Sequence, residues 1–252
     1  MPFIPERLKA RYASLSVLLA LVLAPVLVRA SSMADDEDVG AGQVLNRYLA
    51  ATQAAQNSEL GKSMQVEISA SLPKLKKEGK LRALRHMSDV GHVTYRMLGF
   101  SGDKSIKKDV IARYLTAEVQ ASGNGSDLSI SPANYKFKYK GMQNREGRDL
   151  YVFGLSPRKK EVGLFKGELW IDAKTFMPVR EAGKFVKNPS IFFKRTDFVR
   201  TYKIEDGIAV PDHIDSVIKT RIVGPVELSI NFAKAAPEDE TVSTETGDGG
   251  DE

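Results

Sequence analysis

The segment Tyr135–Lys140, "YKFKYK", alternates aromatic residues and lysines without interruption. An extended chain sends successive side chains to opposite faces, so Tyr135, Phe137 and Tyr139 share one face and the three lysines share the other. Such a strand has one apolar face and one cationic face. Because a half-apolar strand must be covered on its apolar face, the segment predicts a sheet that packs against a second layer or against a ligand.

Further strand-like segments, separated by turn residues, occupy most of the chain from residue 63 onward. In the first of them Val66, Ile68 and Ala70 alternate with polar residues, which is the two-residue period of a half-buried strand. Hairpins at this spacing predict a large antiparallel sheet that curls. We expect strands at residues 63–72, 79–87, 92–100, 133–142, 149–157, 161–172, 177–186, 190–204, 208–222 and 223–235.

Two segments have the period of amphipathic helices. Residues 43–56 place apolar and aromatic side chains on one stripe, and residues 106–120 do the same. Asp103 or Ser105 can cap the start of the second helix. Two helices are therefore available to cover a sheet that is much larger than either of them.

Several strands carry apolar residues on both faces. Phe165, Leu169 and Ile171 share one face of their strand, and Leu164 and Trp170 lie on the other. A sheet with a single buried face alternates more cleanly. We therefore predict a mainly β, α+β fold in which a strongly curved antiparallel half-barrel is partly filled by helix on its concave side and partly open.

The N-terminus has the three parts of a secretory signal peptide. A basic region precedes an uncharged stretch over residues 12–28, and small residues ending at Ala30 and at Ala34 follow it. The uncharged stretch is short for a membrane span of about 20 residues and contains Pro25. We expect a signal peptide over residues 1–34, cleaved after Ala34 or Ala30, with a membrane anchor as the alternative.

The C-terminus is acidic. Residues 237–252 contain seven acidic side chains and no basic one, so they bury too little apolar surface to fold, and we expect a disordered tail. Residues 35–236 then form a single domain. Residues 39–236 carry 33 basic and 20 acidic side chains, a net charge of +13. Such a surface attracts anionic partners. With no cysteine in the chain, disulfides cannot stabilise the fold.

Four short motifs occur in a characteristic order. An apolar strand ends in aspartate at Leu169–Asp172, and Pro178–Arg180 follows after a short turn. An aromatic strand then leads to the turn Glu205–Gly207 and to Val210–Pro211. In this order and spacing the chain resembles the LolA-like group of outer-membrane lipoprotein-sorting proteins.

The resemblance is good over residues 145–235, and over residues 40–140 it extends only to the layout of helices and strands. It implies an unclosed β-barrel, with helices as a lid over an apolar cavity, in the periplasm of the cell envelope. It further implies that the cavity binds acyl chains of a lipid or lipoprotein without bond chemistry or a cofactor. The candidate cavity residues are Phe137, Tyr139, Phe153, Phe165, Leu169 and Ile171.

The main hypothesis is an exported, non-catalytic carrier or chaperone of acyl chains, monomeric after signal cleavage, whose basic body docks at anionic membrane surfaces. Nucleic acid is not an expected partner of an exported protein. The alternative is a structural or adaptor protein of the envelope whose half-barrel is filled by its own helices. A polysaccharide-modifying enzyme is a third reading, and it requires two carboxylates that flank one cleft.

Motifs for other chemistry are absent from the sequence. It contains no G-x-S-x-G, no phosphate-binding glycine loop and no H-E-x-x-H. The three histidines are His86, His92 and His213. His86 and His92 can meet across a turn beside Asp89, but these three would make a poor metal site. We therefore expect no catalytic residue and no bound metal.

Overall fold

A computed structural model describes residues 32–123, 128–188, 193–221 and 224–235. The chain divides after Gln43 into two compact units. In the first unit the described residues form the N-terminal part of helix α1 (Ser32–Glu59). The acidic tail expected at 237–252 lies outside the described residues. So does the signal peptide expected at 1–34, except that residues 32–34 begin α1.

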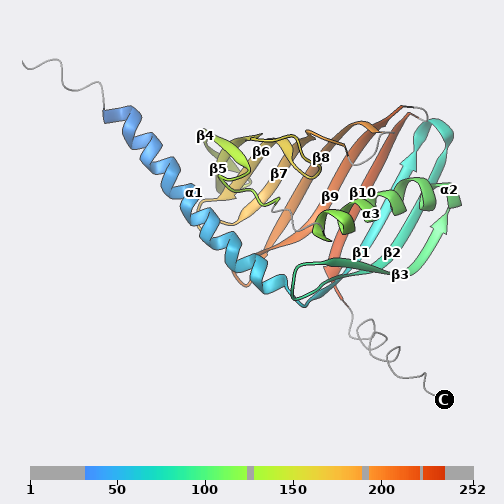
Figure 1. Ribbon diagram of the computed structural model, residues 1–252. Coiled ribbons are helices and arrows are strands. Elements are labelled where there is room, and N and C mark those ends of the chain that lie inside the picture. Colours follow the sequence, from blue (N-terminus) through green and yellow to red (C-terminus); the bar gives the residue numbers. More distant parts are fainter. Residues whose placement is uncertain (1–31, 124–127, 189–192, 222–223, 236–252) are drawn as a thin grey trace, which may run out of the picture. The chain divides into compact units, whose positions relative to one another are not determined.

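The second unit is built on one antiparallel sheet of ten strands in the order β3-β2-β1-β10-β9-β8-β7-β6-β5-β4. Figure 1 shows that the sheet is strongly curved, and β3 and β4 remain as its two separate edges. The predicted fold class, an unclosed, curved antiparallel barrel with helices, is confirmed. The strands are β1 (Ser63–Leu72), β2 (Lys77–Met87), β3 (Val93–Gly102), β4 (Tyr135–Arg145), β5 (Arg148–Pro157), β6 (Phe165–Asp172), β7 (Pro178–Phe185), β8 (Phe193–Glu205), β9 (Ile208–Thr220) and β10 (Pro225–Lys234).

A broken helix lies on the concave face of the sheet at β1–β3 (Figure 1). It consists of α2 (Lys104–Ile106), the π-helical turn η2 (Lys107–Ile111) and α3 (Ala112–Gly123). Elsewhere, the short 3-10 helix η1 (Pro73–Leu75) joins β1 to β2. The Asp103 side chain accepts a hydrogen bond from the backbone N–H of Ser105, 2.7 Å away, so the predicted cap is confirmed. Ile106 and Ile111 are fully buried against the sheet.

The part of α1 within the second unit packs at the other end of the concave face. Ala55 forms an apolar cluster with Met177 and Ala209, and Tyr48 is 4% exposed. The two helices thus cover different parts of the same face. A space that neither of them fills remains between them.

The segment Tyr135–Lys140 behaves as its alternation predicts. The ring of Tyr135 is buried, those of Phe137 and Tyr139 are partly buried, and the three lysines are exposed. Tyr135 lies against Phe165 of β6, with ring centroids 5.7 Å apart. The apolar face of this strand therefore forms part of the concave side of the barrel.

Candidate functional site

A cavity of about 470 Å³ lies on the concave face, and we call it the concave cavity. Its walls come from α1, α3, the segment before β4, and seven strands of the sheet. Both aromatic and polar side chains line it. The lining residues are Tyr48, Thr52, Ala55, Gln56, Arg85, Tyr114, Ala117, Glu118, Leu128, Ser129, Ile130, Tyr135, Val162, Gly163, Phe165, Pro178, Glu181, Phe185, Phe193, Thr196, Phe198, Arg200, Tyr202, Ala209, Pro211, Ile214, Ile218 and Phe232.

Aromatic rings form much of the apolar wall. The ring of Phe198 packs edge-on against Phe165 and stacks on Phe185, with centroids 4.9 Å apart in both cases. Ile214 and Ile218 of β9 continue the wall toward the broken helix. Such rings hold one another in place, so they form a preformed apolar surface.

The six residues predicted from the sequence all lie on the concave face of β4–β6. Phe165 lines the concave cavity, whereas Leu169 and Ile171 are fully buried within the wall behind it. Phe137 and Tyr139 pack against Phe153, with ring centroids 6.3 Å and 5.3 Å apart. The six thus lie on one apolar face of neighbouring strands, and Phe165 reaches the cavity surface.

An ion pair that is buried at its carboxylate lines the cavity from β7 and β8, and neither of its residues was among the predicted site residues. Tyr202 donates its hydroxyl hydrogen to Glu181 Oε1 at 2.6 Å, and Arg200 Nη1 lies 3.3 Å from Glu181 Oε2. The Glu181 side chain is only 6% exposed. Burial opposes the charge on Arg200, but Tyr202 and Glu181 outweigh it and raise its pKa, so the guanidinium stays charged.

A second ion pair, half-buried at its carboxylate, joins β2 and α3 at the cavity. Arg85 Nε donates to Glu118 Oε1 at 3.1 Å, and the hydroxyl of Tyr95 donates to Glu118 Oε2 at 2.6 Å. Burial, reinforced by the charge of Glu118, raises the pKa of Tyr95 above its usual range, so this hydroxyl remains a donor. Each pair contains one cation and one carboxylate, which leaves the cavity electrically balanced.

One signal in the sequence could have indicated the first pair. In the segment "FVRTY", Phe198, Arg200 and Tyr202 alternate and therefore share one face of a strand. Because aromatic residues mark the buried face, an arginine in register with them indicates a buried cation that needs a carboxylate partner. Glu181 is adjacent to Arg180 in sequence, and nothing there distinguishes it from a surface residue.

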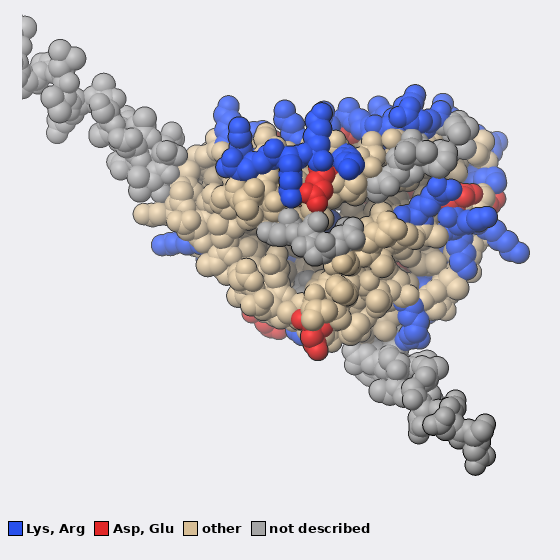
Figure 2. Space-filling view, viewed as in Figure 1, with Lys and Arg blue, Asp and Glu red and all other residues tan. Residues whose placement is uncertain are grey.

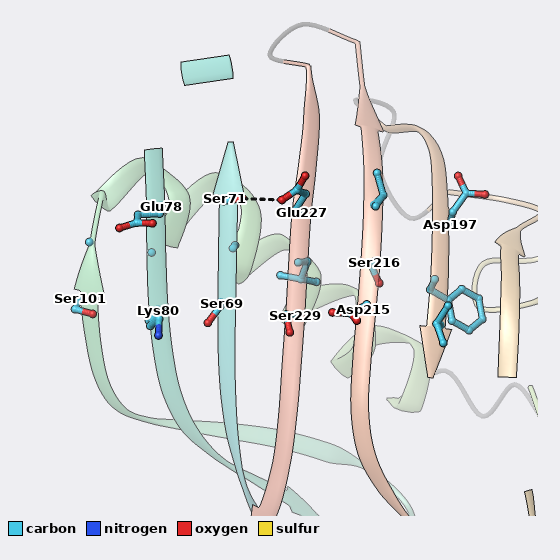
Figure 3. Close-up of a pocket in the computed structure, with 17 residues that line it drawn as sticks. Ser69, Ser71, Glu78, Lys80, Ser101, Asp197, Asp215, Ser216, Glu227 and Ser229 are labelled. Carbon is cyan, nitrogen blue, oxygen red and sulfur yellow. Dashed lines mark hydrogen bonds between the residues drawn. The ribbon is translucent and has the colours of Figure 1, made fainter. Parts of the chain in front are cut away.

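The opposite face of the sheet carries a larger groove of about 640 Å³ across β8, β9, β10 and β1–β3, lined largely by serines and acidic side chains. Figure 3 shows its serines and acidic side chains in rows across the strands, with the broken helix behind the sheet. Ser69 pairs with Ser229 and Lys80 on neighbouring strands, and Ser71 lies 3.5 Å from a carboxylate oxygen of Glu227. These groups are solvated or bonded to one another, so the concave cavity is the better candidate site.

The same outer face is basic at β4–β7. Lys136 and Lys138 of β4, Lys166 of β6 and Lys184 of β7 are all exposed there, and Lys166 and Lys184 are direct cross-strand neighbours. Figure 2 shows basic side chains gathered along the upper border of the molecule in this view. The outer face thus has a basic region over β4–β7, whereas the groove over the remaining strands is lined by serines and by side chains of both charges.

Comparison with solved structures gives matches of low sequence identity. The chain is similar to a LolA superfamily protein from Nitrosomonas europaea, with 13% identity, a TM-score of 0.41, and coverage of 79% of this chain and 96% of that one. It is also similar to a DUF1329 family protein from Desulfovibrio piger (13% identity, TM-score 0.40, 75% and 91% covered). A third is an outer membrane lipoprotein-sorting protein domain from Vibrio parahaemolyticus (12% identity, TM-score 0.35, 77% and 96% covered).

Comparison with models of protein families gives no match, and comparison with curated protein sequences gives none either. Within the described residues, no group of three or more histidine, aspartate or glutamate side chains could hold a metal ion. No helix in the described part of the chain is long and apolar enough to cross a membrane.

Proposed function

We propose that the protein is an exported, non-catalytic carrier that binds the acyl chain of a lipid or lipoprotein in the concave cavity. The observation that supports this most strongly is the cavity itself. Its volume of about 470 Å³ lies within the range of small-molecule sites, which is roughly 300–1,000 Å³. A barrel filled by its own helices, as the adaptor alternative requires, would not leave such a space.

The lining chemistry also fits an acyl chain. Phe165, Phe185 and Phe198 present rings to the cavity, and aliphatic side chains from β9 complete the wall. Burial of each methylene group of a ligand against such a wall contributes about 0.8 kcal/mol. The other predicted residues, Phe137, Tyr139, Phe153, Leu169 and Ile171, form the layer that supports the wall or extends it toward the edge strand β4.

The two carboxylates that line the cavity support a non-catalytic role. Glu181 is bonded to Arg200 and Tyr202, and Glu118 is bonded to Arg85 and Tyr95. A general acid or base must reach the proton that it transfers. Because both carboxylates are already engaged by an arginine and a tyrosine, neither is placed to exchange a proton with a ligand.

Native mass spectrometry with lipid extraction tests the carrier proposal. The protein should be purified gently from the envelope compartment and then treated with detergent. We expect an acyl lipid or lipopeptide to co-purify, to leave on detergent treatment and to be chemically unchanged. A ligand-free mass, together with no uptake of an acyl probe, would support the adaptor alternative instead.

A further inference from the structure

Two tyrosine hydroxyls in the concave cavity have no hydrogen-bond partner. Tyr48 from α1 and Tyr114 from α3 both line the cavity, and the other described residues offer neither hydroxyl a partner. Tyr48 is 4% exposed, so it is shielded from bulk water. Both hydroxyls can therefore donate a hydrogen bond to a ligand that enters the cavity.

These hydroxyls belong to a polar belt that crosses the otherwise apolar cavity. Tyr48 lies within electrostatic reach of Glu181 and Tyr202, and Tyr114 lies within reach of both Arg200 and Glu118. Burial, reinforced by the carboxylates, raises the pKa of both hydroxyls above the usual range. Both therefore remain protonated at neutral pH and can donate a hydrogen bond to a ligand.

The charge balance of the belt restricts what the ligand can be. The two arginines of the cavity are each paired with one glutamate, at 3.3 Å and 3.1 Å, so no cationic charge is left over. A ligand carboxylate would bring an uncompensated negative charge into a low-dielectric site, at a large desolvation cost. An uncharged acceptor, such as an ester or amide carbonyl, can accept the hydrogen bonds without that cost.

The volume restricts the number of chains. A methylene group occupies about as much space as a water molecule, roughly 30 Å³, so a cavity of about 470 Å³ holds on the order of 15 such groups. This corresponds to one acyl chain. Two or three chains of a multiply acylated lipid would not fit within it together.

We infer that the concave cavity takes one acyl chain at a time and that Tyr48 and Tyr114 donate hydrogen bonds to the ester or amide carbonyl that begins this chain. The inference rests on the proposed function and narrows it. It assigns a preference for uncharged acyl esters and amides over free fatty-acid anions. It also assigns this preference to the hydroxyls of Tyr48 and Tyr114. Substitution of either tyrosine by phenylalanine removes the hydroxyl and keeps the ring in the apolar wall.

Displacement of the fluorescent probe N-phenyl-1-naphthylamine by three ten-carbon ligands tests the inference. Monodecanoylglycerol has the carbonyl, 1-O-decylglycerol lacks it but has the same chain and head, and decanoate carries a charge. We expect the ester to bind about tenfold more tightly than the ether, since each hydroxyl contributes one net hydrogen bond. Decanoate should bind more weakly than the ester, and native mass spectrometry should show one ligand per chain.

The double variant Tyr48→Phe/Tyr114→Phe removes only the two hydroxyls. Its preference for ester over ether should fall to within about twofold, because the remaining contacts are the same for both ligands. Its affinity for the ether should not change, which also shows that the cavity is intact. Tyr151→Phe is the matched control, because Tyr151 stacks on Phe176 and packs against Tyr139 outside the cavity, so it should keep the full preference.

Three outcomes would overturn the inference. Equal binding of ester and ether by the unaltered protein would do so while leaving the carrier proposal intact. Tighter binding of decanoate than of the ester would refute the argument from charge balance. Failure to bind the probe and all three ligands would refute the inference and the carrier proposal together.

Discussion

At the scale of single residues, the concave cavity combines an aromatic wall with two ion pairs, each of which has one well-buried partner. Of the two carboxylates in these pairs, Glu181 is the more buried. It is bonded to Arg200 and also accepts a hydrogen bond from Tyr202. Attraction between buried charges roughly offsets their desolvation, whereas one buried charge alone is strongly unfavourable. The stability of the cavity should therefore depend on both partners being present or both being absent.

Arg200→Met should lower the free energy of unfolding by about 3–5 kcal/mol, because Glu181 would stay buried without its cation. The double variant Arg200→Met/Glu181→Met should regain most of this loss, ending within about 1–2 kcal/mol of the original protein. Urea unfolding of the two variants measures both values. A double variant as unstable as the single one would show that the pair itself stabilises the fold.

These pairs also mark the limit of what the sequence predicts at this scale. Alternation correctly placed Tyr135, Phe137 and Tyr139 together on the apolar face of their strand, because a strand with one buried face repeats every two residues. The burial of Glu181 could not be predicted. A carboxylate is placed inside by a partner that is distant in sequence, and hydropathy carries no information about that partner.

At the scale of elements, β6 and β7 approach each other closely at a pair of glycines. Gly167 and Gly183 are direct cross-strand neighbours. A Cβ atom at Gly167 would lie only 2.6 Å from the Cα of Gly183 and would overlap the backbone carbonyl of Ala182. The two strands therefore approach each other so closely that only glycine fits at this position.

Gly167→Ala should lower the free energy of unfolding by about 1–3 kcal/mol or more, because the strands must separate to admit the methyl group. Gly99→Ala in β3 is the control. It has open space around its Cα, so it should be neutral or stabilise the protein by about 0.4–1 kcal/mol. Thermal unfolding compares the two variants, and equal melting temperatures would show that the close approach at Gly167 does not require glycine.

The elements themselves were largely predictable. The first strand was expected at 63–72 and occurs at Ser63–Leu72, and the turn expected at 173–176 joins β6 to β7. Turn residues and two-residue alternation are local signals, so they can be read directly from the chain. The pairing of β1 with β10, which places the first hairpins beside the last strand, is a long-range contact and could not be inferred from such signals.

At the scale of the whole molecule, the basic region on the outer face of β4–β7 supports the proposed docking at anionic membranes. Lys136→Gln/Lys138→Gln should weaken binding to phosphatidylglycerol-containing vesicles roughly 30-fold at low salt, because each lysine near the surface contributes about 1 kcal/mol. The variant Lys74→Gln/Lys76→Gln is the matched control, because it removes the same two positive charges at the turn between β1 and β2, away from β4–β7. Vesicle co-sedimentation measures both, and equal losses would indicate a non-specific effect of net charge.

The central claim is that the concave cavity holds an acyl chain, and filling the cavity tests it most directly. Ala117 of α3 lines the cavity, whereas Ala112 of the same helix is exposed and does not. A tryptophan at position 117 would occupy space that the chain needs, while one at position 112 would project into solvent.

The decisive measurement is titration of a fluorescent fatty-acyl ester into the unaltered protein, Ala117→Trp and Ala112→Trp. The account predicts saturable binding by the unaltered protein and by Ala112→Trp, and at least tenfold weaker binding by Ala117→Trp with its fold retained. Binding by Ala117→Trp as tight as that of the unaltered protein would place the acyl chain outside the cavity and contradict the account.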